Sequence, residues 1–596
     1  MDVFTTKSGR VRGRRAARDG GIVAVLGVPY AAPPFGARRF REPQPTEPWD
    51  DVRDCTAFGP VAPQSAELPG APSWSPGDRD ILTLNVWTPA DGPGDLPVLV
   101  WIHGGAYVFG SSAQPDFDGT ALAGGGLVVV TLNSRLGFEG FGHVPGADAN
   151  TDADLPVSGS DSDLPVPGAD SDLPVPGADS DLLVSGADSD LPVPGADSDL
   201  LVSGADSDLP VPGADTGAAV FPDNRGLLDQ IAALEWVRDN ISAFGGSPDR
   251  VTLAGQSSGA TSVACLTVAD RARGLFRRAV LHSAVNAFAT VEQAARTTAE
   301  VAAAAGVPAT RAGLLAAPPE ALVAATDRVC ERYAQDPGSG QRHYDPAIYG
   351  PVADGVLLTA DPLEALAAGA GGAVELLVCH TTEEYWLLDA VGSTAKITSE
   401  EQLAAFAADF GLPASLVDGH RERLPDAPLL DVYLSLYSGL LFAEYSTRLA
   451  EAHALAGGRA FLARFDRRRD RAGGRVRAWH CADIPFAFGN LHEESVHFLV
   501  GGPPGAADQE LSRRMARAWA GFAAQGDPGW APLDGPAGGG ETVRVWRTEA
   551  EEEAHAARRP GGARRADGVR RVEGGRGAEH GFRDLWRTAG LPLLAP

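Results

Sequence analysis

The sequence predicts an α/β fold built on a mostly parallel central sheet with helices on both faces. Two observations carry this prediction. Short apolar runs of strand length, such as residues 96–102 and 127–132, alternate along the chain with longer segments of helical spacing. These runs are continuously apolar, as expected for strands that are covered on both faces. Strands that alternate with helices in this way form one largely parallel sheet.

Composition bounds the function before any motif does. The chain has 596 residues, of which 44% are hydrophobic, so it can bury a sizeable core as one large α/β domain. Its formal net charge of −28 argues against nucleic acid as a partner. Its five cysteines are scattered and show no metal-binding spacing, so we expect no metal site and no disulfide framework.

The sequence also gives an expectation about location. The N-terminus has no apolar segment of a signal peptide, and no run of about 18 apolar residues predicts a membrane span. We therefore expect a cytoplasmic protein with no membrane partner. Its oligomeric state is left open by the sequence.

The first part of the predicted domain, residues 1–145, consists of strands joined by loops rich in proline and glycine. We expect strands over residues 22–26 and 81–89, and the latter is closed by a proline. The buried strands 96–102 and 127–132 follow, and they belong to the centre of the sheet.

Strand 96–102 ends in His103-Gly104-Gly105-Ala106. Small residues at the end of a strand present backbone N–H groups with no side chains in the way. A turn of this kind forms the oxyanion hole in lipases and esterases. The alternative is an ordinary Gly-Gly turn with a hydrogen-bonded loop histidine, and this segment alone does not decide between them.

An acidic repeat interrupts the chain over residues 146–216. Residues 146–215 hold 16 Asp and no Lys, Arg or Glu, in a nine-residue unit that reads Asp-Leu-Pro-Val-Pro-Gly-Ala-Asp-Ser. Frequent proline, dense charge and the lack of aromatics favour a disordered insert. A calcium-binding β-roll also uses nine-residue units, but it needs a Gly-Gly-x-Gly-x-Asp pattern that this unit lacks.

The second part of the domain, residues 217–546, resumes the α/β pattern. Residues 224–241 have an apolar stripe at helical spacing. Residues 547–596 form an Arg- and Gly-rich tail that we expect to be largely disordered. The arginines of this tail could bind a polyanion, but a solvated tail is the favoured interpretation.

Residues 251–259 carry the strongest chemical signal. Four strand-forming residues run into Gly255-Gln-Ser257-Ser-Gly259, and a small-residue segment with helical character follows. This strand–turn–helix context is that of a nucleophile elbow. Ser257 would sit in a strained turn, and the flanking glycines allow close approach of the chain. The alternative is a chance Gly-x-Ser-x-Gly in a chain with 72 glycines.

A serine nucleophile needs a general base, and the base needs an acid that fixes its tautomer. In chains with such an elbow the order is Ser, then Asp or Glu, then His. Strand 374–378 leads to two candidate acids, Glu383 and Glu384. His480 lies on a loop before an apolar segment and is the candidate base. The residues alone leave the choice of carboxylate open.

From about residue 8 to 546, apart from the repeat, the chain resembles the type B carboxylesterases, which have the α/β-hydrolase fold. That resemblance implies a helical region around an active-site gorge. It rests on these motifs: Gly27-Val-Pro-Tyr-Ala, Leu84-Asn-Val-Trp-Thr-Pro, Trp101-Ile-His-Gly-Gly-Ala, Asn240-Ile-Ser-Ala-Phe-Gly-Gly-Ser-Pro and Val251-Thr-Leu-Ala-Gly-Gln-Ser-Ser-Gly.

The resemblance implies a serine carboxylic-ester hydrolase that acts on small-molecule esters without a cofactor. It implies Ser257 as nucleophile, His480 as general base and Glu384 as the acid. It also implies an oxyanion hole made by the backbone N–H groups of Gly105, Ala106 and Ser258. The alternative is a catalytically silent esterase-like binding protein, but such proteins typically lack a triad member.

The sequence departs from the family pattern at several positions near these residues. Family members usually have Glu before and Ala after the nucleophile, and a glycine after both the acid and the base. In this sequence Gln256 and Ser258 flank Ser257, Tyr385 follows the acid and Cys481 follows the base. Cys379 and His380, shortly before Glu383 and Glu384, also depart from the family pattern. The departures leave the triad residues present, and they bear on the placement of the acid and the shape of the pocket.

Overall fold

The computed structural model describes residues 2–65, 72–146, 221–344, 347–471, 474–534, 542–557, 569–571 and 581–591. These residues belong to one unit, which is formed by residues 1–146 and 220–596. The acidic repeat predicted over residues 146–216 lies outside the described residues, apart from Gly146.

The described residues form an 11-stranded sheet. Its strands, in order across the sheet, are β18 (Val569–Arg571), β17 (Thr542–Trp546), β14 (Ala460–Phe465), β13 (Glu375–Thr381), β10 (Arg278–His282), β9 (Gly246–Gln256), β7 (Leu96–Ile102), β8 (Val128–Leu132), β6 (Thr83–Pro89), β4 (Ile22–Pro29) and β3 (Arg14–Arg15). Neighbouring strands from β17 to β8 run parallel, and the pairs at both edges are antiparallel. The predicted α/β fold with a mostly parallel sheet is confirmed.

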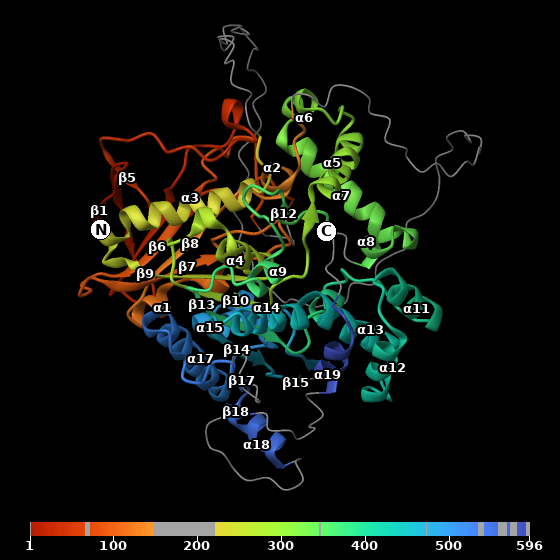
Figure 1. The fold of residues 1–596 in the computed structure, drawn as a ribbon. Coiled ribbons are helices and arrows are strands. Elements are labelled where there is room, and N and C mark those ends of the chain that lie inside the picture. The colour runs from red at the N-terminus through yellow and green to blue at the C-terminus, as the bar shows by residue number, and fades with distance from the viewer. Residues whose placement is uncertain are drawn as a thin grey trace, which may run out of the picture. The chain divides into compact units, whose positions relative to one another are not determined.

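Both faces of the sheet are buried, as the continuously apolar strands predict. In β7, Val98 and Val100 belong to one core cluster, whereas Leu99 and Trp101 belong to another. The first cluster lies under helices α3 (Arg225–Asn240), α4 (Ser258–Val268) and α14 (Glu444–Leu455). The second lies under α1 (Thr120–Gly124), α15 (Ile484–Phe488) and α17 (Ala506–Gln525). Figure 1 shows α3 and α4 on the opposite side of strands β7 and β9 from α1 and α17.

The remaining elements surround this sandwich. The other α-helices are α2 (Gly137–Phe141), α5 (Val291–Ala305), α6 (Arg311–Ala316), α7 (Pro319–Gln335), α8 (Gln341–Tyr344), α9 (Pro362–Ala367), α10 (Trp386–Ala390), α11 (Glu400–Asp409), α12 (Ala414–Arg423), α13 (Leu429–Ser438), α16 (His497–Val500), α18 (Glu549–Ala557) and α19 (Gly581–Thr588). The small sheets pair β1 (Val3–Thr5), β2 (Arg10–Arg12) and β5 (Val52–Asp54), β11 (Ala289–Thr290) with β12 (Val352–Ala353), and β15 (Arg469–Arg471) with β16 (Gly474–Val476). Within the described part of the chain, no helix is both long and apolar enough to cross a membrane.

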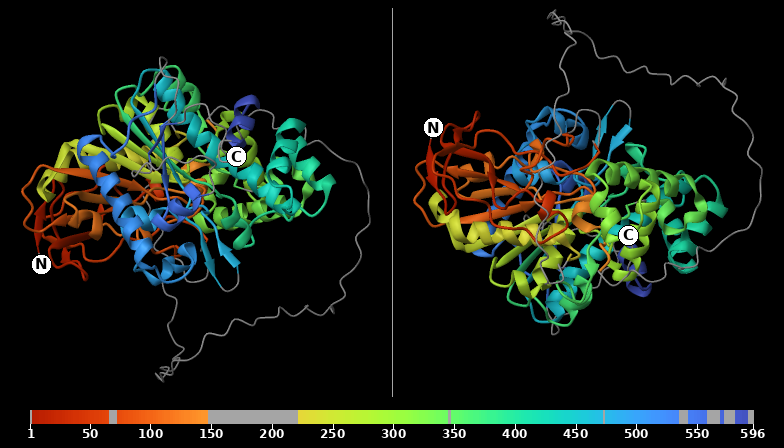
Figure 2. Two further views of the ribbon diagram at one scale, coloured as in Figure 1. Left: turned by 90° about the horizontal axis from the view of Figure 1, so that it is seen from below. Right: turned by 90° about the horizontal axis from the view of Figure 1, so that it is seen from above.

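Helices α11 to α13 build a third core at the end of the domain away from the N-terminal strands (Figure 2). Its centre is aromatic. Phe406 of α11 packs edge-on against Tyr433 of α13, with the ring centroids 4.9 Å apart. Helix α19 of the tail joins this core, because Trp586 is buried there and Phe582 lies on the His420 ring. The expected disorder of the tail therefore does not extend to α19, because its apolar side chains pack against this third core.

Candidate active site

The turn between β9 and α4 holds Ser257 in a strained conformation. Its backbone has φ 56° and ψ −127°, in a region that few non-glycine residues adopt. A Cβ on Gly255 would lie 2.5 Å from the carbonyl oxygen of Gly259, and a Cβ on Gly259 would clash with the carbonyl of Ile102. The elbow geometry that the sequence predicts is thus present, and space alone requires both flanking glycines.

The segment after β7 brings backbone N–H groups beside this elbow. Gly105 has φ 120°, and a Cβ there would clash with the backbone of Phe109. Ala106 also has a positive φ, of 50°. Among the described residues, no acceptor takes the N–H of Gly105, Ala106 or Ser258. Ser258 is the first residue of α4, so its N–H lies at the positive end of the helix dipole.

His480 and Glu384 form a buried pair. Nδ1 of His480 lies 2.6 Å from Oε2 of Glu384. The other carboxylate oxygen accepts 2.7 Å hydrogen bonds from the Ser283 hydroxyl and from the Thr381 N–H. Because the ionised carboxylate only accepts, it fixes the imidazole with its proton on Nδ1. Nε2 of His480 therefore carries the lone pair of the neutral ring.

The charge state of His480 depends on its surroundings. Burial acts to lower the pKa of His480, but its contacts with Cys481 and Glu384 outweigh burial and hold that pKa above its ordinary value. The ring of Phe442 covers the imidazole, with centroids 4.3 Å apart. Neither Ser283 nor Phe442 belongs to a motif, so nothing in the sequence singles them out.

Glu383, the alternative acid, is occupied elsewhere. Its carboxylate accepts hydrogen bonds from Arg468 Nε at 2.8 Å and Arg477 Nη1 at 2.9 Å. It also accepts the N–H of Ala478 at 3.1 Å. These contacts make Glu383 part of an ion-pair network, and His480 contacts Glu384 instead.

The structure does not join Ser257 and His480 by a hydrogen bond. Ser257 is buried, with 8% of its surface exposed. Its hydroxyl has no hydrogen-bond partner among the described residues. Nε2 of His480 instead lies 2.9 Å from Nε2 of Gln256. The sequence marks Gln256 as a departure from the family pattern, but it gives no sign of this contact.

The other departures are accommodated without displacing Glu384. Tyr385 is fully buried among aromatic rings, and its hydroxyl donates to the carbonyl of Tyr344 at 2.8 Å. The Nδ1 atom of His380 lies 2.8 Å from the carbonyl oxygen of Thr381. Burial lowers the pKa of His380 to about 4, so this ring is neutral at physiological pH. The side chain of Cys379 belongs to the second core cluster, which lies under helices α1, α15 and α17.

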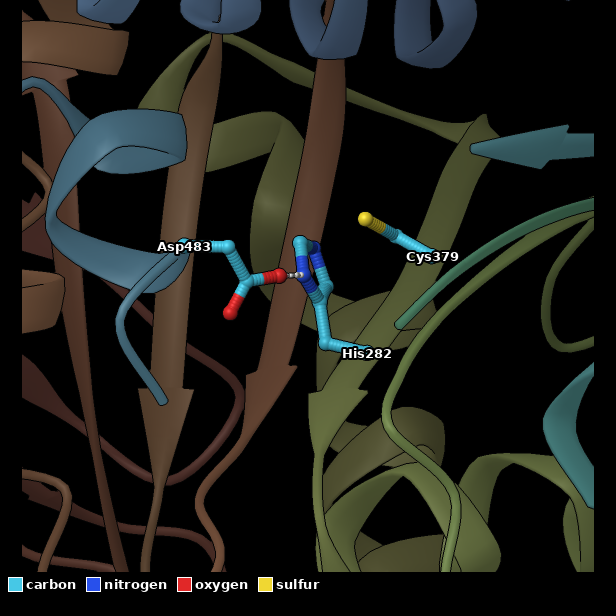
Figure 3. Close-up of side chains that lie close together, drawn as sticks. All are labelled: His282, Cys379 and Asp483. Atoms are coloured by element: carbon cyan, nitrogen blue, oxygen red, sulfur yellow. Dashed lines mark hydrogen bonds and ion pairs between the residues drawn. The ribbon is translucent and has the colours of Figure 1, made fainter. Parts of the chain in front are cut away.

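One buried cluster has the side chains of a metal site. Figure 3 shows His282 of β10 between Asp483 and the sulfur of Cys379, with Nδ1 of His282 2.6 Å from Asp483 Oδ2. The indole N–H of Trp519 donates to Nε2 of His282 at 2.7 Å. Since Nε2 accepts, the proton of this imidazole is on Nδ1, where a metal ligand would need a lone pair. The cluster is therefore a hydrogen-bonded histidine–carboxylate pair and does not fit a metal.

Comparison with known proteins places this architecture. A sequence model of the carboxylesterase family matches residues 1–152 and 214–555. The chain is 31% identical over 554 residues to the para-nitrobenzyl esterase of Bacillus subtilis, covering 92% of this chain and 95% of that protein. It is 29% identical over 532 residues to the fumonisin B1 esterase of Sphingopyxis macrogoltabida, covering 88% and 82%. Among solved structures, a Geobacillus stearothermophilus carboxylesterase matches with a TM-score of 0.69 and 30% identity, covering 94% of this chain and all of that one. The chain belongs to the carboxylesterase family and is a carboxylic-ester hydrolase.

Proposed function

We propose that Ser257, His480 and Glu384 are the catalytic triad of this hydrolase. The hydroxyl of Ser257 attacks the ester carbonyl while Nε2 of His480 takes its proton. His480 then returns that proton to the leaving alcohol, and the acyl group remains on Ser257. His480 next takes a proton from a water molecule that attacks the acyl-enzyme, and it returns this proton to the Ser257 oxygen as the carboxylic acid leaves. The observation that carries this assignment is the 2.6 Å contact between His480 and Glu384, beside the strained serine turn.

The oxyanion of each tetrahedral intermediate is assigned to the N–H groups of Gly105, Ala106 and Ser258. Two observations support this assignment. These N–H groups donate to no described residue, and they lie on the two segments that meet at Gly259. Each donor that is aimed at the developing charge can be worth about 3 kcal/mol in the transition state.

The substrate class is small carboxylic esters. The relatives are named for different esters, a para-nitrobenzyl ester and fumonisin B1, so a panel of esters that varies acyl and alcohol size defines the preference. We assign the protein to the cytoplasm, in keeping with the free thiols of Cys55, Cys265, Cys379 and Cys481. With a net charge of −28, we assign it no nucleic-acid partner.

The direct test is Ser257→Ala with an ester turnover assay and an organophosphonate label. Ser257→Ala is expected to abolish turnover, leaving only the residual rate that the oxyanion hole and binding provide. The wild-type chain should gain the mass of one phosphonyl group, on Ser257, and the variant should gain none. Turnover near the wild-type rate in the pure variant would overturn the assignment. A wild-type chain that neither turns over nor labels would identify a silent binding protein.

A further inference from the structure

The side-chain amide of Gln256 lies on the nitrogen that the proposed mechanism needs. Because Glu384 fixes the His480 proton on Nδ1, the 2.9 Å contact at Nε2 is a hydrogen bond that Gln256 donates. The same amide nitrogen also donates to Cys481 Sγ at 3.0 Å. Both hydrogens of the Gln256 amide therefore have acceptors, and one of these acceptors is the base.

This hydrogen bond competes with the reaction. A neutral imidazole nitrogen has one lone pair in the ring plane, so Nε2 of His480 accepts one good hydrogen bond. When Gln256 occupies that lone pair, the Ser257 hydroxyl cannot donate to it, and Ser257 has no other partner among the described residues. After proton transfer Nε2 becomes a donor, and it would then face the N–H of Gln256. The amide must leave Nε2 before Ser257 reacts.

Two neighbours of Gln256 are shaped around its amide. The amide oxygen fills the space where a side chain on Gly104 would begin. Cys481 has φ 66°, a left-handed conformation that favours glycine, yet it carries a side chain that reaches Gln256. Burial raises the pKa of Cys481, which leaves a neutral thiol as the acceptor. The two departures from the family pattern at 256 and 481 are thus in contact and form a pair.

We propose that Gln256 is a positioning residue that occupies Nε2 of His480 in the free enzyme and yields it to Ser257 when an ester binds, while the Cys481 sulfur retains the amide. Only hydrogen bonds are exchanged in this step, and the proton of Ser257 follows the path described above. The inference rests on the proposed function, because it takes His480 as the general base.

Removal of the amide is the first test. The probe is a neutral organophosphonate, whose second-order rate constant with Ser257 is measured at a pH where His480 is neutral. Gln256→Met, which keeps the length but has no donor, should raise this rate constant severalfold, because no hydrogen bond must be displaced. Gln256→Asn, whose shorter amide does not reach His480, should behave alike if the methionine variant folds poorly. Gln230→Met, a buried glutamine without contact to His480, should leave the rate constant unchanged.

The second test is a carboxylate at the same position. The titratable groups around His480 are Glu384 and Cys481, with Asp483 and Asp116 beyond Cys481. Gln256→Glu adds a negative charge within hydrogen-bond distance of Nε2, which stabilises the imidazolium. The acid-side midpoint of kcat/KM, which reports the free enzyme, should rise by about one unit or more. The midpoint of kcat should rise less, because the side chain has left Nε2 in the complex.

The third test is the coupling to Cys481. Cys481→Gly should slow phosphonylation severalfold in the wild-type background, because the released amide has no sulfur to hold it away from His480. In the Gln256→Met background, at a pH where His480 is neutral, the same change should have a much smaller effect. The inference is overturned if Gln256→Met and Gln256→Asn are unchanged or slower, if Gln256→Glu moves neither midpoint, or if Cys481→Gly acts equally in both backgrounds. These failures differ from failure of the proposed function, in which Ser257→Ala itself retains turnover.

Discussion

This protein contains two histidine–carboxylate pairs with nearly the same geometry. In both His480–Glu384 and His282–Asp483, Nδ1 lies 2.6 Å from a carboxylate oxygen, and in both the acid is fully buried. The difference is at the other nitrogen. Nε2 of His282 is held by the Trp519 indole inside the core, whereas Nε2 of His480 meets an amide next to Ser257. Both pairs share the contact with an acid, so the proposed role of His480 as a base depends on the group that faces Nε2.

The largest expected difference between the pairs comes from removing each histidine. His480→Gln should lower kcat by roughly 10⁶, the size found when a serine hydrolase loses its base. His282→Gln should keep kcat within about tenfold and cost about 1–3 kcal/mol of stability, because a buried hydrogen-bonded group is lost. Ester turnover and urea unfolding of both pure variants measure this. Comparable losses of kcat would break the distinction between the pairs.

The acids should separate in the same way. Glu384→Gln should lower kcat by about 10⁴, since the amide neither stabilises the imidazolium nor holds the correct tautomer. Glu383→Gln, the matched control one residue away, loses contacts to Arg468 and Arg477 and should keep kcat within about tenfold. A larger loss at Glu383 would show that the wrong carboxylate is assigned.

The pH dependence sharpens the comparison further. The proposed role of His480 as a base requires a neutral ring, and the pKa of His480 lies above the ordinary value of histidine. As pH falls through that raised pKa, kcat/KM should decrease about tenfold per unit, with a midpoint above 6.5. The neutral ring of His380, with a pKa of about 4, does not titrate in this range. A midpoint below 6.5 would mean that the contacts with Cys481 and Glu384 do not outweigh the effect of burial on the pKa of His480.

The smallest effect is expected from deletion of residues 154–216. Both histidine pairs belong to the unit formed by residues 1–146 and 220–596, so the deletion should leave them intact. The acidic repeat has little apolar area to offset its ordering entropy, and each doubling of loop length costs only about 0.6 kcal/mol. Melting and ester turnover should therefore match the parent. A melting point lower by more than about 8 °C, or lost turnover, would show that the repeat supports the hydrolase.

The sequence predicts most of the fold, because a sheet that is buried on both faces requires strands that are continuously apolar. It also predicts the serine elbow, since only glycines allow the close contacts at 255 and 259. The residues alone do not separate Glu383 from Glu384, which are adjacent and equally charged. The structure pairs them differently because one side chain turns toward Arg468 and the other toward His480.

The contacts of Gln256 and His282 are not predictable from pattern. Each depends on the register that aligns Gln256 of β9 with His282 of β10, and on a loop more than 190 residues further along the chain. Spacing rules describe one element at a time and contain no information about which loop covers it. The same reason explains α19, whose apolar face becomes meaningful only beside α12 and α13.

The contact of Gly259 with the carbonyl of Ile102 has a consequence for folding. The native contact between α4 and the end of β7 exists only when β7 is paired with β9, because that pairing brings Ile102 and Gly259 together. Ser257 and the N–H groups of the Gly105 segment therefore come together when segments about 150 residues apart in the chain pair with each other. During refolding, ester turnover reports this long-range event, and recovery of helical signal alone does not.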